Sequence, residues 1–120
     1  MSYRFEKLNV WTESRNFIRD IYLVINDFPS KEIFILGDQL KRAAISIALN
    51  IAEGSDKKSD RDFIRFLRIS LGSLNEVVTA LYIAKDLNYL NDKTFQKLYL
   101  NANKLSAMIN ALIAKLNEKK

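Results

Sequence analysis

Three polar residues interrupt an apolar run in the segment SIALNIAEG. Ser46, Asn50 and Glu53 supply a hydroxyl, an amide and a carboxylate at spacings of four and three residues, which places them on one side of a helix. Ser73 and Glu76, three residues apart, offer a second hydroxyl and a second carboxylate. Such groups could bind a polar ligand or a metal ion, or they could form a structural network of hydrogen bonds.

Several kinds of catalytic and metal chemistry are excluded by composition. The 120 residues include no histidine and no cysteine, so Ser–His and Cys–His catalytic pairs cannot form. Disulfides and cysteine-based zinc sites are excluded for the same reason. The di-iron sites of helical bundles use a Glu-x-x-His motif, which this chain also lacks. We therefore predict no enzymatic activity, no cofactor and no metal site.

The polar residues of this segment belong to a longer stripe. On a helical wheel with about 100° per residue, five polar side chains fall within roughly 80° of one another: Gln39, Arg42, Ser46, Asn50 and Glu53. The other positions between Ala43 and Ala52 are apolar and cover roughly 240°, whereas a core-facing stripe is only a little over 100° wide. Alanines at positions 43, 44, 48 and 52 would let a neighbouring helix approach closely. We therefore predict that this helix also forms a subunit interface in a homo-oligomer.

A stripe at the edge of buried surface needs hydrogen-bonding partners. The segment 72–76 could supply them, because Gly72 would allow close backbone approach. Arg42 could pair with Glu53 or Glu76, across helices or across subunits. We favour this structural network over a ligand or metal site, and its predicted members are Gln39, Arg42, Ser46, Asn50, Glu53, Ser73 and Glu76.

Basic residues gather just after the polar stripe, and we call them the basic row: Lys57, Lys58, Arg61, Arg65 and Arg68. With Asp60 and Asp62 subtracted, residues 57–68 carry a net charge of +3 (five minus two), and the whole chain carries +5. Three arginines in this row share one helical face at four- and three-residue spacing, which suits contact with phosphates. The alternative is a solvated face that binds nothing.

Helices must position all of these residues. One proline, three glycines and no alternating pattern favour helices joined by short turns. We predict helices over residues 9–27 and 38–53, with Phe28-Pro29-Ser30 ending the first. Gly54 is the expected left-handed residue at the end of the second. Residues 31–37 could add a helical turn.

Start signals and a regular apolar seam define two more helices. Ser59 and Asp62 form an [ST]-x-x-[DE] start signal for a helix that runs to about residue 88. Asn91 or Asp92 can cap a last helix that continues to about residue 117. Its seam keeps four- and three-residue spacing through Leu98, Ala102, Leu105, Ile109, Leu112 and Leu116. The prediction is an all-α protein, an antiparallel up-and-down four-helix bundle with residues 1–120 in a single domain.

Cellular location can be predicted from what the sequence lacks. The start, MSYRFEKLNVW, has no apolar block like that of a signal peptide. No stretch approaches the roughly 18 uninterrupted apolar residues of a membrane span. Together with the absence of cysteine, this predicts a cytoplasmic protein without a membrane partner.

Several segments also carry a family resemblance. They are Phe28-Pro29 with Glu32, QLKRAAISIALNIAEG over residues 39–54, FIRFLRISLGSLNE over residues 63–76, and LNYL over residues 87–90. In these segments the chain resembles the bacterial four-helix bundle proteins encoded in intervening sequences of 23S ribosomal RNA genes, also labelled S23 ribosomal proteins. It departs from them at Ser70 and Leu71, where alanine and a basic residue are usual, so a ligand contact at position 71 is not carried over.

The resemblance implies a bundle that assembles as a ring, with a pentamer as the expected form. It also implies kinship with the accessory proteins of diversity-generating retroelements, which are basic bundles that work with a reverse transcriptase and nucleic acid. Charge and resemblance together predict a non-catalytic homo-oligomer that binds RNA or DNA, with RNA favoured, or a ribonucleoprotein. The alternative is a scaffold that recruits a protein partner without touching nucleic acid.

Overall fold

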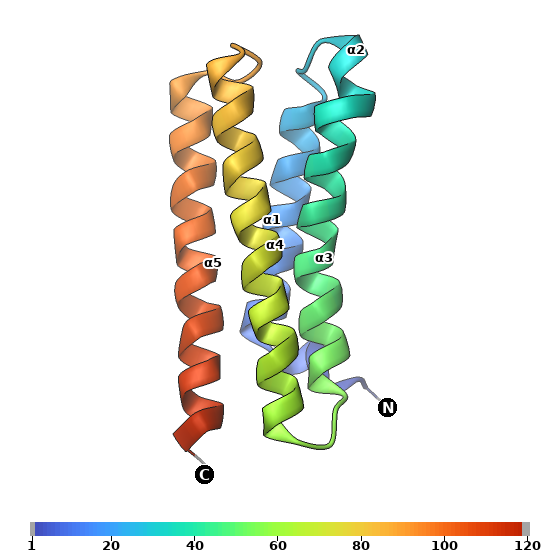
Figure 1. Ribbon diagram of the computed structural model, residues 1–120, viewed down its shortest axis with the longest axis vertical. Helices are drawn as coiled ribbons and strands as arrows, with labels where there is room; N and C mark the ends of the chain where they lie inside the picture. The colour runs from blue at the N-terminus through green and yellow to red at the C-terminus, as the bar shows by residue number, and fades with distance from the viewer. Residues whose placement is uncertain (1, 119–120) are drawn as a thin grey trace.

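The computed structural model describes residues 2–118, and its main elements are four long helices packed side by side (Figure 1). These are α1 (Asn9–Ile25), α3 (Asp38–Ser55), α4 (Asp60–Asp86) and α5 (Asp92–Glu118). A short 3-10 helix, η1 (Arg4–Lys7), precedes them, and α2 (Ser30–Glu32) leads through the π-helical segment η2 (Ile33–Gly37) into α3. Since residues 2–118 contain no strand, the prediction of an all-α protein with four helices is confirmed.

The core lies between all four helices and is filled by large apolar side chains. Ile21, Leu40, Phe63 and Phe95, one from each helix, are almost fully shielded from solvent. Helix α3 packs against α1 and α4, and α5 packs against the same two helices on the other side. On α5, the predicted seam is buried except at Leu112, which is only partly covered. The four- and three-residue spacing therefore identified the core-facing side of this helix.

Side-chain and backbone caps fix the ends of the two longest helices. Ser59 Oγ accepts a hydrogen bond from the Asp62 amide at 3.1 Å, as the start signal predicts. Asn91 Oδ1 accepts from the Thr94 amide at 2.8 Å, so Asn91 is the cap of α5. At the end of α4, Asn88 adopts a φ of 62°, and the Tyr89 amide donates back to the Ala84 carbonyl at 2.9 Å. This left-handed turn reverses the chain between α4 and α5.

The predicted role of Gly54 is wrong. No glycine among residues 2–118 has a positive φ, and α3 continues through Gly54 to Ser55. The glycine is needed because α3 and α4 lie very close here. A Cβ at this position would stand 2.6 Å from the Phe66 Cβ and 3.0 Å from Cδ1 of Phe63, closer than real side chains come. Its small size, rather than its conformational freedom, matters at this position.

Helix α4 is long and apolar enough, by length and composition, to cross a membrane. Its apolar residues nevertheless include a buried series, with Phe63, Leu67, Leu74 and Leu81 packed in the core of the bundle. A core helix of a bundle passes the same test of composition, so this feature is weak evidence for a membrane span.

Candidate functional site

A chain of three hydrogen bonds, one of them between helices, joins polar residues of α3 and α4. Ser46 Oγ and Ser73 Oγ are 2.8 Å apart, across the two helices. Asn50 Nδ2 donates to the Ser46 carbonyl at 2.8 Å and to Ser46 Oγ at 3.0 Å. Ser46 Oγ accepts from the amide, and either serine hydroxyl can donate in the bond between Ser46 and Ser73. These three residues of the predicted network are thus brought together in one chain of hydrogen bonds.

Sequence analysis missed a fourth member of this helix–helix contact. Ser70 Oγ, which is fully buried, donates to the Ile47 carbonyl at 2.9 Å. Its hydroxyl lies one turn before Ser73 on the same face of α4, so both serines touch α3. The spacing of three residues between them was visible in the sequence. Ser70 was noted there only as a departure from the family pattern.

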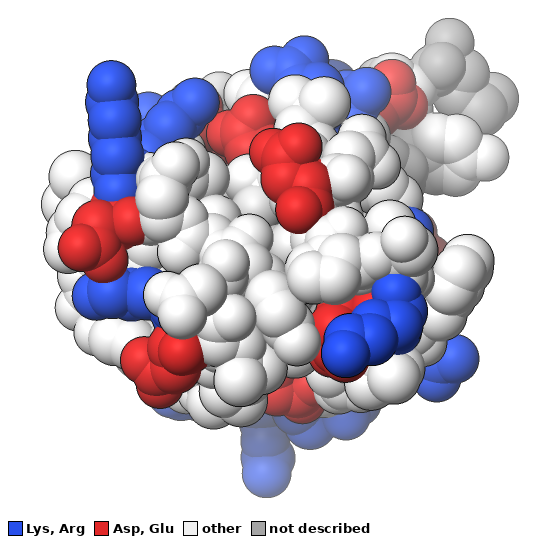
Figure 2. Space-filling model, turned by 90° about the horizontal axis from the view of Figure 1, so that it is seen from above, with Lys and Arg blue, Asp and Glu red and all other residues white. Residues whose placement is uncertain are grey.

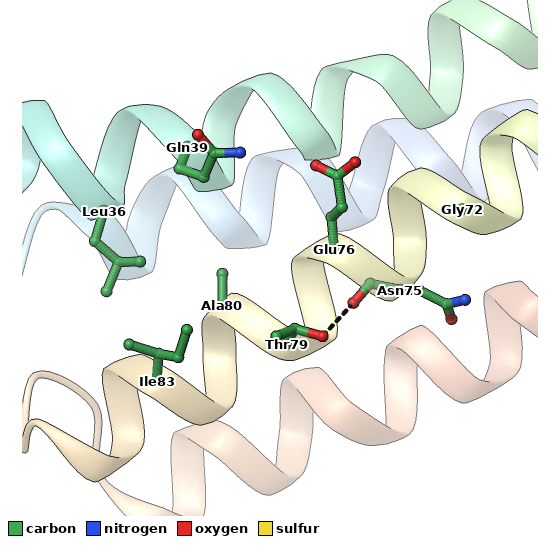
Figure 3. A pocket seen from close by; sticks show the side chains of 8 residues that line it. All are labelled: Leu36, Gln39, Gly72, Asn75, Glu76, Thr79, Ala80 and Ile83. Atoms are coloured by element: carbon green, nitrogen blue, oxygen red, sulfur yellow. Dashed lines mark hydrogen bonds between the residues drawn. The ribbon is translucent and has the colours of Figure 1, made fainter.

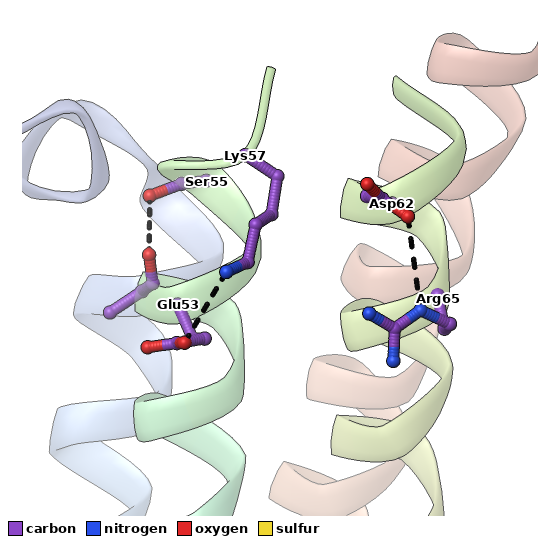
Figure 4. A network of polar contacts seen from close by, with 6 residues as sticks. Glu53, Ser55, Lys57, Asp62 and Arg65 are labelled. Atoms are coloured by element: carbon purple, nitrogen blue, oxygen red, sulfur yellow. Dashed lines mark hydrogen bonds and ion pairs between the residues drawn. The ribbon is translucent and has the colours of Figure 1, made fainter. Parts of the chain in front are cut away.

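The remaining polar residues of the stripe do not join the network. Glu53 is exposed and lies 3.5 Å from Lys57 Nζ, an ordinary pair between successive helical turns (Figure 4). The predicted pairing of Arg42 with Glu53 or Glu76 is wrong within one chain, because residues 2–118 contain no such ion pair. Gln39 and Glu76 both point into an open groove, described next.

The outer groove between α3 and α4 has a volume of about 550 Å³ and is lined by Leu36, Gln39, Gly72, Asn75, Glu76, Thr79, Ala80 and Ile83 (Figure 3). We call it the α3/α4 groove. Gly72 was expected to allow close contact with the neighbouring helix. That expectation is wrong, since nothing lies within 4 Å of a Cβ built there. The absent side chain instead leaves the groove open.

The alanines of α3 also differ from prediction. Ala43, Ala44 and Ala48 are buried by their own chain, against helices that flank α3 on both sides. Most of the apolar arc that seemed to need another subunit is therefore covered within one bundle. The exceptions are Leu49, which is 63% exposed, and Ala52, the fourth alanine, which is only partly buried. An interface between copies must consequently use other surfaces than these alanines.

The basic row lies at the α3–α4 turn and along the exposed side of α4. Two of its members have carboxylate neighbours: Lys57 pairs with Glu53, and Arg65 Nε lies 3.9 Å from Asp62 Oδ1 (Figure 4). Both pairs are exposed and therefore weak. Among residues 2–118, three members of the row have no ion-pair partner: Lys58, Arg61 and Arg68. They remain available to an anion.

The opposite end of the bundle, which carries α2, has a different character. Figure 2 looks onto this end and shows acidic and basic side chains interspersed around an uncharged centre. In this view neither sign forms a continuous field, so the end offers no comparable site for a polyanion.

The hydrogen-bond network gives a first prediction. Asn50→Leu should lower the free energy of unfolding by about 1–2 kcal/mol, because Ser46 loses its amide donor in a half-buried place. Glu53→Leu, by contrast, should change it by less than about 0.5 kcal/mol, since only an exposed ion pair is lost. Urea unfolding followed by circular dichroism measures both. Equal losses in the two variants would contradict the assignment of Asn50 alone to the network.

The chain matches a known family over most of its length. The model of the family described as 23S rRNA-intervening sequence protein matches residues 6–111. The chain belongs to this family. The matched part contains the α3–α4 hydrogen bonds, the α3/α4 groove and the basic row, so all of them are features of a family member.

A solved structure supports the fold independently. It is a protein of unknown function from the S23 ribosomal protein family of Bacteroides thetaiotaomicron VPI-5482, with 23% sequence identity and a TM-score of 0.80. The match covers 87% of this chain and 97% of that one. At this identity the likeness establishes the bundle and not an activity. No curated protein matches the chain. The predicted kinship with retroelement accessory proteins stays a prediction.

Proposed function

We propose that this member of the 23S rRNA-intervening sequence protein family is a non-catalytic, ring-forming cytoplasmic bundle that binds RNA. The observation that carries the proposal is the basic row, in which Lys58, Arg61 and Arg68 are exposed and have no carboxylate partner among residues 2–118. Phosphate groups neutralised by these side chains would release counterions, which favours binding without selecting a sequence.

Assembly into a ring would repeat the basic row once in every subunit, and two different surfaces of the bundle suit the contact between subunits. The groove supplies an apolar wall and the carboxylate of Glu76, which has no ion-pair partner within residues 2–118. The outer side of α1 carries the complementary groups, a shallow surface of Arg15, Ile18, Arg19 and Tyr22. A second copy docking its α1 there would pair arginine with Glu76. Because the two surfaces differ, the contact is head-to-tail and can close into a ring. The family resemblance favours five subunits.

Fluorescence anisotropy with a single-stranded RNA at increasing salt tests RNA binding. A single strand that contacts three unpaired cations per subunit should give a slope of about −2 or steeper for log K against log salt. Absence of binding at about 20–50 mM salt, where contacts with phosphates are strong, would refute the proposal. Binding that ignores salt would refute it equally.

Charge reversal identifies the binding surface. The triple variant Lys58→Glu, Arg61→Glu and Arg68→Glu should weaken RNA binding by at least about 100-fold at low salt, since three attractive contacts become repulsive. The control reverses Lys93, Lys97 and Lys115 on α5, which changes the total charge equally. The control should bind several-fold less tightly at most. If both variants lose affinity alike, the basic row has no special role.

Exposed apolar residues at the opposite end of the bundle support a second candidate function, the recruitment of a protein partner. Phe34 and Ile35, in the π-helical turn η2, are 76% and 66% exposed. Large apolar side chains at the surface are typical of protein–protein contacts. The protein would then be a scaffold that recruits a protein partner without touching nucleic acid. Pull-down before and after nuclease treatment separates the two functions. A partner retained after nuclease, but lost on Phe34→Ser, would favour the scaffold.

A further inference from the structure

A second hollow, of about 300 Å³, lies beside the basic row, between the start of the chain and the end of α3. Leu49 and Ala52 of α3 and the rings of Tyr3 and Phe5 give it apolar sides. Glu53 and Asp56 add two carboxylates to the lining. We call this space the Tyr3 hollow. Leu49, the exposed large apolar residue of α3, therefore forms part of its wall.

The wall formed by the start of the chain is held in place by specific contacts. The Tyr3 amide donates to Glu6 Oε1 at 2.7 Å, which begins the helical turn η1. Arg4 Nη1 donates to the Ser55 carbonyl at 3.0 Å, and its guanidinium lies 5.1 Å from the centre of the Phe63 ring. This segment is thus attached to both α3 and α4, and the hollow is preformed.

Tyr3 presents an open aromatic face. Its ring stacks on Phe5 with a centroid distance of 5.4 Å and an interplanar angle of 15°, and Phe5 in turn contacts Trp11 at 4.7 Å. Tyr3 is 71% exposed, so the series of rings ends at the surface. A supported, exposed aromatic ring beside cationic side chains is the arrangement on which proteins stack the bases of single-stranded nucleic acids.

The carboxylates decide which base fits. The carboxylate oxygens of Glu53 and Asp56 are hydrogen-bond acceptors, so a guest that pairs with them must carry donors on its edge. Among the bases, guanine offers adjacent N1–H and N2–H groups, which match the two oxygens of one carboxylate. Lys57 Nζ lies 3.5 Å from Glu53 Oε1, one of the carboxylates of the hollow, and Lys58 follows it in the chain, so both could contact the flanking phosphates.

We propose that the Tyr3 hollow binds an unpaired guanine base of single-stranded RNA, stacked on Tyr3 and hydrogen-bonded through its Watson–Crick edge to Glu53 or Asp56. The inference rests on the proposed RNA binding and adds base selectivity to it. The basic row would hold the backbone, and the hollow would select one base.

Anisotropy with labelled uridine hexamers that carry one central guanine, adenine or uridine tests this inference. The wild type should bind the guanine hexamer about tenfold more tightly than the other two. Tyr3→Ala should abolish that preference and leave the salt slope unchanged, because no phosphate contact is lost. Tyr3→Phe, which keeps the ring, should retain the preference. Asp56→Asn combined with Glu53→Gln should remove it as well.

Different results would overturn the guanine site alone or the proposed RNA binding as well. Equal affinity for the three hexamers, with a normal salt slope, would overturn the guanine site and leave the proposed RNA binding intact. No binding of any hexamer or of longer RNA would overturn both. If Tyr3→Ala instead dissociates the assembled protein in size-exclusion chromatography, the hollow is filled by a second copy of the chain, and the inference is overturned.

Discussion

Gly54→Ala should lower the free energy of unfolding by about 1–3 kcal/mol, although alanine is the better helix former. The added Cβ would lie 2.6 Å from the Phe66 Cβ, which is fixed to the α4 backbone and cannot rotate away. The helices α3 and α4 must therefore separate slightly, and the Phe63 ring must shift as well, so the end of the core is disturbed. For a bundle of this size, the melting temperature should fall by several degrees.

Gly72→Ala is the matched control, because Gly72 also lies inside a long helix and has nothing within 4 Å of its ideal Cβ. This substitution should raise the free energy of unfolding by about 0.5–1 kcal/mol, the difference in helix propensity. Urea unfolding of the two variants measures the contrast directly. Losses of equal size at both glycines would show that α4 does not approach α3 as described.

Ile83→Glu should dissociate the assembled protein into single chains. Ile83 is 44% exposed in one copy and lines the α3/α4 groove, where the α1 surface of a second copy is proposed to dock. Burial of such a side chain contributes about 1.5–3 kcal/mol, which the substitution removes, and a carboxylate must lose its water to enter the apolar wall of the groove. Size-exclusion chromatography with light scattering should therefore give the mass of one chain, 13.9 kDa.

The matched control is Leu100→Glu. Leu100 is 62% exposed and lies on α5, and it lines neither of the two proposed contact surfaces. The same change of charge at this position should leave the assembled mass unchanged. If Leu100→Glu dissociates the protein and Ile83→Glu does not, the interface lies on α5 and the groove is not used.

The four helices and their core-facing sides could be predicted from the sequence, because local signals fix them. The seam of α5 follows a strict spacing, and Ser59 and Asn91 accept the cap hydrogen bonds expected of their residue types. Gly54 misled the prediction because glycine at the end of a helix usually marks a left-handed turn. Its actual role depends on the distance to Phe66, which is not a local property.

The candidate site was predicted less completely, again for a physical reason. The helical wheel put Ser46 and Asn50 on one stripe, and Ser73 was a natural partner once α3 and α4 were neighbours. The wheel could not show how much of α3 its own chain covers. Alanine suits contact with a helix of the same chain as well as with one from another copy. Here Ala44 is fully buried within one chain, on a helix that packs against α1 and α4.

The Tyr3 hollow could not be found from sequence patterns at all. Its walls come from residues about fifty positions apart, joined by the hydrogen bond from Arg4 to the Ser55 carbonyl. Neither a period nor a motif connects these segments. Only the folded chain places Tyr3 beside Glu53 and Asp56.

Sedimentation equilibrium of the purified wild-type protein at several micromolar concentrations tests most directly whether copies of this bundle cover one another's exposed grooves. Head-to-tail docking predicts one closed species whose mass is a fixed multiple of 13.9 kDa, five-fold if the family resemblance holds, and which does not change with dilution. A homogeneous species of 13.9 kDa at every concentration would contradict ring formation and the repeated basic surface that depends on it.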